Sequence, residues 1–282
     1  MAKPIIEAVT DATLDEFAEF LHQHLSQEQS AAQWADRFRA AWPGNRPNYG
    51  FVLRDAGNIV GGIGAFYAER KIRGQLEKTC NITSWCVLDA YRQQSMRLAM
   101  SVIGQPGYHF TDFSPTKVVS GTLQFFKFRP LDERQAVLLN LPSLFQKGQV
   151  LDQRAEIEAA LDGPQLQIYR DHADFPWLQH IVLGQPGDWC HVIYKRRTFK
   201  GLSAAGVIYL SSGAAFCKYF RRLGSHLLAR GVISTHVECR FLPHLPWPSA
   251  VRAGFNPKLY LSQTLQDGDI DYLYSETVAL DL

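Results

Sequence analysis

The sequence predicts an α/β protein of the α+β type, with two domains that each contain a mostly antiparallel mixed sheet flanked by helices. Three observations lead to this fold class. The chain has 282 residues, which is enough for two hydrophobic cores. A strand pattern runs directly into a helical pattern between Asn81 and Arg97. The order of hairpin, helix and strand in the first half also occurs in the second half, so we expect domains at residues 1–145 and 149–282.

The first half begins with a strand, two helices and a hairpin. Leu14, Phe17 and Leu21 recur at helical spacing, which is typical of an amphipathic helix. Residues 55–58, with the sequence DAGN, are of the types that accept positive φ in a hairpin turn. The glycines at 61–64 predict a bend or a close approach of backbone. These elements are expected at residues 4–9, 13–25, 34–42, 49–53 and 59–66.

The junction between strand and helix points to a function. Residues 82–87 are mainly β-branched, aromatic or small apolar, as in a half-buried strand. A helical pattern opens at Tyr91, with Met96, Leu98 and Val102 on one side. The first N–H groups of a helix have no intrahelical partner and carry the positive end of its dipole, so the junction predicts an anion site.

These residues resemble the GNAT superfamily of acyl-CoA-dependent N-acyltransferases. Val87 ends the strand, Tyr91-Arg92 is an aromatic-arginine pair, and Arg92 to Arg97 fills the phosphate-loop register, with Ser95 and Arg97 at positions where that family has small residues. The resemblance implies that the pyrophosphate of an acyl-CoA donor, acetyl-CoA or another acyl-CoA, lies on residues 93–97. A backbone N–H at Val87 or Leu88 would hold the thioester oxygen. The expected donor-binding residues are Val87, Leu88, Arg92, Gln93, Gln94, Ser95, Met96 and Arg97.

The rest of the first half is expected to contain a strand at residues 108–113 and a helix at 116–126. The resemblance covers residues 4 to 140, but the tyrosine that often serves as general acid in the family falls at Leu123 here. We predict Asp112 as the proton acceptor, since the resemblance implies that its strand splays beside Val87. The structural alternative for Asp112 is a helix cap next to Ser114-Pro115.

The sequence of the second half predicts a degenerate domain with the same order of elements. It would contain helices at 152–161 and 214–231, strands at 189–194, 205–210 and 232–241, and a terminal strand at 269–276. Lys195 to Lys200 would form a basic turn, either solvated or in contact with the CoA 3′-phosphate or an acidic acceptor.

Composition excludes several classes of protein. The formal net charge is only +2, without long basic blocks, which argues against a nucleic-acid partner. The five cysteines have no C-x-x-C spacing and suggest reduced thiols in the cytoplasm. No apolar run approaches 18 residues, so we expect no membrane partner, and no metal-ligand spacing is present, so we expect no metal.

The expected function is transfer of an acyl group, first of all acetyl, from acyl-CoA to an amine or hydroxyl of a small molecule or sugar by direct attack. Two alternatives remain from the sequence. The chain could be a degenerate, non-catalytic GNAT-like protein that binds a ligand or partner. It could also be a Fem-type transferase, which has two GNAT-like halves and takes aminoacyl-tRNA as donor. The sequence leaves the acceptor and the oligomeric state open.

Overall fold

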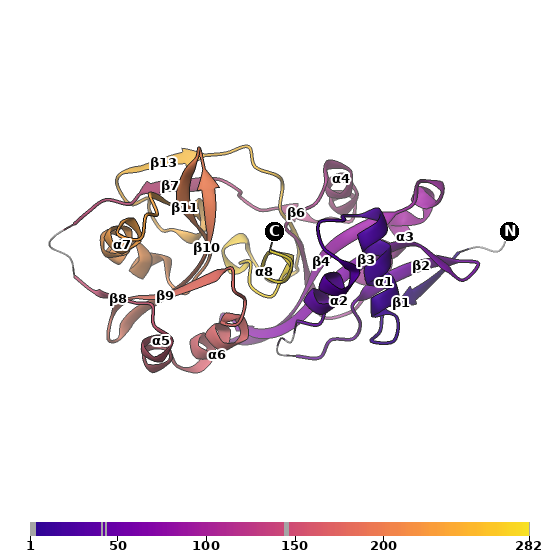
Figure 1. Ribbon diagram of the computed structural model, residues 1–282, viewed down its shortest axis with the longest axis horizontal. Coiled ribbons are helices and arrows are strands. Elements are labelled where there is room, and N and C mark those ends of the chain that lie inside the picture. The colour runs from indigo at the N-terminus through magenta and orange to yellow at the C-terminus, as the bar shows by residue number, and fades with distance from the viewer. Residues whose placement is uncertain (1–3, 41, 43, 144–146, 282) are drawn as a thin grey trace. The chain divides into compact units, whose positions relative to one another are not determined.

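The computed structural model describes residues 4–40, 42, 44–143 and 147–281, and these form two compact units (Figure 1). Unit 1 contains the described residues up to Leu131 together with Pro257–Leu265 and those from Tyr274 onward. Unit 2 contains Asp132–Asn256 and Gln266–Leu273. Each unit has a seven-stranded mixed sheet flanked by helices, which confirms the predicted α+β class. None of the helices in the described part of the chain is long and apolar enough to cross a membrane.

The sheet of unit 1 has the order β1-β2-β3-β4-β5-β14-β6. Only β4 and β5 run parallel; the other neighbours are antiparallel. The long strands β3 and β4 form the central hairpin, and β2 and β3 form the hairpin that the DAGN turn at residues 55–58 predicts. The strands are β1 (Ile5–Ala8), β2 (Gly50–Asp55), β3 (Asn58–Ile72), β4 (Gln75–Val87), β5 (Tyr108–Asp112), β6 (Arg129–Pro130) and β14 (Leu259–Leu261).

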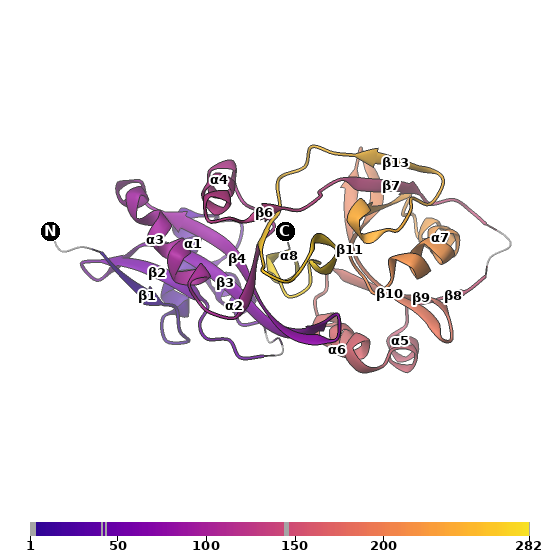
Figure 2. The same cartoon turned by 180° about the vertical axis from the view of Figure 1, so that it is seen from behind.

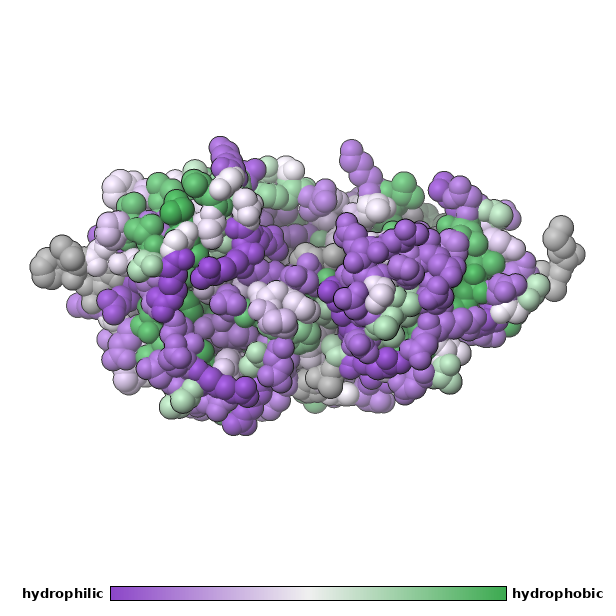
Figure 3. Space-filling model, in the orientation of Figure 1, coloured by the Kyte–Doolittle hydropathy of each residue, from purple (hydrophilic) through white to green (hydrophobic). Residues whose placement is uncertain are grey.

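Helices cover both faces of this sheet (Figures 1 and 2). One face packs against α3 and α4 through a cluster that includes Leu98 and Leu123. The other packs against α1, α2 and the C-terminal segment through Phe17, Phe38 and Leu280. The outer surface over α1 and α2 is mostly hydrophilic (Figure 3), as expected for amphipathic helices. The helices are α1 (Leu14–His24), α2 (Ala31–Phe38), α3 (Ser95–Ile103), α4 (Lys117–Phe125) and α8 (Glu276–Ala279), with a 3₁₀ helix η1 (Asp89–Gln94).

Unit 2 has the same plan, with the order β8-β9-β10-β11-β12-β7-β13 when its sheet is read from the other edge. Its single parallel pair, β11 with β12, occupies the position of β4 with β5. Helix α7 packs on one face through Phe216, Tyr219 and Leu223. The strands are β7 (Gln135–Leu139), β8 (Gln149–Leu151), β9 (Leu178–Gln185), β10 (Asp188–Phe199), β11 (Leu202–Leu210), β12 (Ser234–Glu238) and β13 (Ser249–Arg252). The helices are α5 (Arg154–Ala160), α6 (Gly163–His172) and α7 (Gly213–Leu228), with 3₁₀ helices η2 (Cys239–Phe241) and η3 (Asp267–Asp269).

The chain is divided differently from the expected domains 1–145 and 149–282. The first crossing lies between Leu131 and Asp132, and two later segments return to unit 1. The reason is an exchange at the sixth sheet position. Unit 1 receives β14 from the end of the chain, whereas unit 2 receives β7 from just after the crossing. Local sequence patterns carry no information about such distant strand pairing.

The predicted terminal strand at 269–276 is wrong. The segment contains the end of η3, irregular chain and the start of α8. The Asp271 side chain accepts a hydrogen bond from the N–H of Leu273, and the Ser275 side chain accepts one from the N–H of Thr277. These backbone groups therefore bond within local turns and a helix cap and not to a neighbouring strand. Residues 272–280 are all buried, and this continuous burial lacks the two-residue alternation of a half-buried strand.

Two glycines of β3, Gly62 and Gly64, allow side chains of the helices to pack closely against the sheet. A Cβ at Gly62 would lie 2.4 Å from Cε2 of Phe17, and one at Gly64 would lie 2.6 Å from Cζ of Phe38. Both phenylalanine side chains are fully buried and cannot move away cheaply. The two positions therefore set how tightly α1 and α2 pack on the sheet.

We predict that Gly62→Ala destabilises the protein by about 1–3 kcal/mol through overpacking against Phe17. Urea unfolding measures this as a lower midpoint at unchanged slope. Gly121→Ala is the matched control, because nothing lies within 4 Å of its Cβ position on α4. The control should raise stability by roughly 0.5–1 kcal/mol through better helix propensity. Equal effects of the two changes would refute the packing explanation.

Candidate functional site

The site begins where β4 and β5 separate. The two strands pair in parallel over only four positions, from Lys78 opposite Tyr108 to Asn81 opposite Thr111. β4 then continues to Val87, while β5 ends at Asp112 and pairs with β14 along its other edge. Within the described residues, no strand pairs with the β5-facing edge of β4 beyond Asn81. This fork exposes backbone N–H and C=O groups that need partners.

A β-bulge changes the face to which the side chains point in the part of β4 that borders the fork. Gly62 lies opposite Cys86 and Gly64 opposite Thr83, so two steps along β3 match three along β4. Ser84, inside the bulge, has a φ of 48°, which is unusual for a residue with a side chain. The extra residue inverts the alternation of faces beyond it.

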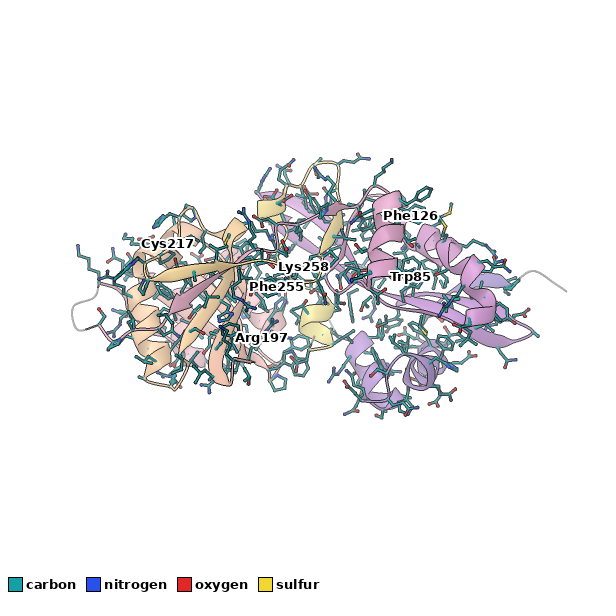
Figure 4. The ribbon with its side chains drawn as sticks, turned by 90° about the horizontal axis from the view of Figure 1, so that it is seen from above. Trp85, Phe126, Arg197, Cys217, Phe255 and Lys258 are labelled. Atoms are coloured by element: carbon teal, nitrogen blue, oxygen red, sulfur yellow. The ribbon has the colours of Figure 1, made fainter. Side chains whose placement is uncertain are left out.

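Because of the bulge, Trp85 and Val87 lie on the same face as Ile82, against the cluster below α3 and α4. Figure 4 labels Trp85 together with Phe126, which packs against the same cluster. The indole Nε1 of Trp85 is buried and has no hydrogen-bond partner among the residues that the structure describes. A regular strand would have turned Trp85 and Val87 toward α1 and α2.

Of the two backbone donors expected for a thioester oxygen, only Val87 remains available. The N–H of Leu88 donates to the carbonyl of Val60 at 3.0 Å. In an antiparallel ladder, bonded and non-bonded pairs alternate, so the next pair, Val87 with Gly61, is the non-bonded kind. The N–H of Val87 therefore points away from β3, toward the fork.

The helical segment after the fork begins earlier than the sequence predicts. The 3₁₀ helix η1 starts at Asp89 and runs without a break into α3 at Ser95. The N–H of Ser95 donates to the carbonyl of Arg92, so this donor is already used. The hydroxyl of Tyr91 donates to Asp55 Oδ2 at 2.6 Å and anchors the segment to the turn between β2 and β3.

The side chains of the predicted phosphate loop do not point to one common position, and the two arginines have separate partners. Arg92 is exposed and pairs with Asp89 at 2.7 Å. Arg97 donates from Nη1 to the carbonyl of Pro4 at 3.1 Å and to Gln94 Oε1 at 2.8 Å. Gln93 and Met96 are exposed, whereas Gln94 and Ser95 are half-buried.

The fork also holds a buried pair of carboxyl groups, Asp112 and Glu276. Asp112 ends β5, and Glu276 begins α8. Glu276 Oε1 accepts from the N–H of Phe113 at 2.9 Å and from the hydroxyl of Ser114 at 3.3 Å. The N–H of Glu276 donates to Asn81 Oδ1 at 2.7 Å, which ties α8 to the last paired position of β4.

Burial sets the protonation of this pair. It raises the pKa of Glu276 to about 7. Burial and the nearby charge of Glu276 raise the pKa of Asp112 well above its usual value. Glu276 Oε2 is buried without a hydrogen-bond partner among the described residues. The two groups therefore titrate as a coupled pair.

Sequence reasoning found one half of this pair and missed the other. Asp112 was expected at the end of its strand, where the structure has it, although its Oδ1 also accepts from the N–H of Ser114 at 3.1 Å, as in the capping alternative. Glu276 lies more than 160 positions away in the chain and was assigned to a strand. No local pattern marks it, since only the return of the C-terminal segment to unit 1 brings it to Asp112.

We predict that Glu276→Gln removes a pH dependence of stability. A raised carboxyl pKa contributes stability that is fully present below the ordinary value, 4.5, and is lost as pH rises toward about 7. The loss for the native protein amounts to at most roughly 3 kcal/mol. Glutamine keeps the acceptor for Phe113 and does not ionise. Chemical unfolding at a series of pH values should therefore give a flatter curve between 4.5 and 7 for the variant, and parallel curves would contradict the assignment.

Comparisons with known proteins bear on the fold. No protein-family model and no curated protein sequence matches the chain. Among solved structures, a GCN5-related N-acetyltransferase from Anabaena variabilis matches with a TM-score of 0.58 at 10% identity, over 92% of this chain and 72% of that one. A probable N-acyltransferase from Enterococcus faecalis matches with a TM-score of 0.58 at 9% identity, over the same shares. Eis1 from Mycobacterium abscessus matches with a TM-score of 0.52 at 15% identity, over 91% and 72%.

These identities are low, and the likeness therefore concerns the fold. It extends over almost the whole chain and not only over residues 4–140, from which the resemblance was first drawn. The expected GNAT-like fold is confirmed.

Proposed function

We propose that this chain is an acyltransferase that uses acyl-CoA as donor and the amine or hydroxyl of a small molecule as acceptor. The fork between β4 and β5 is the observation that supports it best. A strand edge that ends unpaired, beside a helical start, offers a backbone donor and a positive dipole to one elongated ligand with a polar chain and a phosphate end. Acetyl-CoA is the simplest such donor.

In this proposal the protein contributes position and charge stabilisation, and the acceptor attacks the thioester directly. The carbonyl oxygen becomes negative as the acceptor adds, and the N–H of Val87 would hold it there. The bulge at Ser84 fixes the direction of that N–H before the donor arrives. No covalent intermediate on the protein is required, because both reactants are held together.

The donor pyrophosphate would lie on residues 93–97. Arg92 can exchange Asp89 for a phosphate at small cost, because that ion pair is exposed on both sides, at 75% and 86%. In the described part of the chain, Arg97 is held by two neutral oxygens, at Pro4 and Gln94. A phosphate oxygen is a stronger acceptor for a guanidinium than either of them.

The pair of Asp112 and Glu276 would accept the proton that the acceptor loses. A useful base has a pKa near the working pH, and Glu276 meets this condition with a pKa of about 7. Asp112 would act through the pair, since burial and the neighbouring charge of Glu276 raise its pKa. The low net charge supports a small-molecule acceptor over a nucleic acid.

Ser95→Asp should weaken acetyl-CoA binding at least tenfold, because it adds a negative charge beside the proposed phosphate position. A thermal-shift titration measures this, since a ligand at a hundred times its Kd adds about 2.7 kcal/mol of stability. Met100→Asp is the control, because it places the same charge on an exposed position five residues further along α3. If both variants bound acetyl-CoA equally well, the donor could not bind at residues 93–97.

Asp112→Asn and Glu276→Gln should each lower kcat at least tenfold with acyl-CoA affinity unchanged, once an acceptor is identified. The native rate should rise with pH to a plateau above about 7, following deprotonation of Glu276. In Glu276→Gln that step should disappear. An unchanged pH profile in the variant would exclude the pair as proton acceptor, as would a loss that unfolding accounts for.

A second candidate is a non-catalytic protein that binds an acyl-CoA or a related ligand. The Ser95 N–H is already donated to Arg92, and Leu123, at the register of the family's tyrosine, is fully buried without a hydroxyl. Acyl-CoA binding without turnover for any of a panel of amines would favour this candidate over the enzyme.

A further inference from the structure

A second cavity lies within unit 2, apart from the fork. It has a volume of about 340 Å³, which is within the range of small-molecule sites. Charged and apolar side chains both line it. The polar residues that line it include Asp152, Arg154, His180, Tyr194, Arg196 and Arg230.

The cavity exists because β8 leaves the sheet early. β8 pairs with β9 over only three positions, ending with Leu151 opposite Val182. β9 begins at Leu178, so its first residues extend past the end of β8. The chain then turns away at Asp152 into α5. The space between this departing chain, α6 and the bare end of β9 is the cavity.

Its charge is positive. Three arginines and one aspartate line it, which leaves an excess of two positive charges. Arg230 pairs with Asp152 at 2.6 Å, and Arg154 is drawn to Glu158 at 3.1 Å, outside the lining. Arg196 has no ion-pair partner among the residues described, and its charge partly offsets the burial that raises the pKa of Tyr194.

The direction of Arg196 follows from the length of β10. The sequence predicts a basic turn from Lys195 to Lys200, but β10 continues to Phe199. Alternation along the strand puts Arg196 with Tyr194 on one face, and Lys195 and Arg197 on the other. Arg197, which Figure 4 labels, packs over Gly206. The strand thus directs a single cation of this basic run into the cavity.

A neutral histidine forms part of the wall. Burial lowers the pKa of His180 to about 4, so it carries no charge at neutral pH. Its Nε2 lies 3.3 Å from the carbonyl of His172 and therefore carries the proton. Its Nδ1 then accepts from His191 Nε2, also at 3.3 Å. The part of the wall that His180 forms is therefore uncharged at neutral pH and does not repel or attract an anion.

We propose that this cavity is a binding site for a phosphate group, either inorganic phosphate or the phosphate of a small monoester. Arg196 and Arg230 provide planar, multiple donors that match phosphate oxygens, and Tyr194 adds a hydroxyl donor. Asp152 fixes the position of Arg230 and repels a second anion. We therefore expect the cavity to bind one phosphate group. The apolar residues Ile157, Leu178 and Ile181 would contact the carbon part of a monoester.

Calorimetric titration of the full-length protein with inorganic phosphate tests the site. We expect saturable binding that Arg196→Gln weakens at least tenfold, with Arg196→Lys in between, because lysine keeps the charge and loses the fork of donors. Arg170→Gln is the matched control, since Arg170 is exposed on α6 outside the lining and should leave binding unchanged. Phosphate binding that survives Arg196→Gln, or no saturable binding to the native protein, would overturn the proposal.

A second variant separates this site from the fork. Ser95→Asp should leave the Arg196-dependent phosphate binding unchanged, because Ser95 belongs to unit 1. Loss of phosphate binding in Ser95→Asp would place the anion at the start of α3 and also overturn the proposal. Failure of acyl-CoA binding leaves the prediction for unit 2 as it stands, since no residue is shared.

Discussion

The short parallel pairing of β4 and β5 is the constraint on which the rest of unit 1 depends. Four paired positions hold the two strands together, and beyond Asn81 they diverge. A parallel sheet cannot simply end inside a domain, because its backbone groups would be left buried and unbonded. The structure meets this demand with a bulge in β4, a helix start beside its end and a returning C-terminal segment that bonds to Asn81.

The returning segment explains why a carboxyl pair lies in the interior. Glu276 reaches the fork because α8 begins there, and its Oε1 replaces water for the N–H of Phe113 and the hydroxyl of Ser114. Asp112 is brought close by the end of β5. Burying two carboxyl groups together costs stability unless protons are retained, and this cost is what raises both pKa values. A proposed catalytic property thus follows from the way the chain is closed.

The two units have the same strand order, but the strand pairing that ends early lies at a different position in each sheet. In unit 1 the divergence occurs between the parallel strands and leaves a fork lined by backbone. In unit 2 the departure of β8 from β9 leaves a cavity lined by arginine side chains. Backbone at a fork suits an elongated chain such as pantetheine, whereas guanidinium groups suit a compact anion. Under the two proposals, the same fold plan would provide two different kinds of site.

The sequence by itself determined what local interactions decide. The helical spacing of α1 and the β-branched and glycine-rich runs of β3 and β4 depend on neighbours in the chain, and these elements lie where the pattern has them. Asp112 at a strand end was readable for the same reason. Only the tertiary structure decided that β14 and β7 exchange sheets, that Glu276 meets Asp112, that Val87 keeps its N–H for the fork, and that Arg196 faces a cavity. Each of these depends on contacts between residues far apart in the chain, or on one extra residue in a bulge, and neither leaves a periodic mark in the sequence.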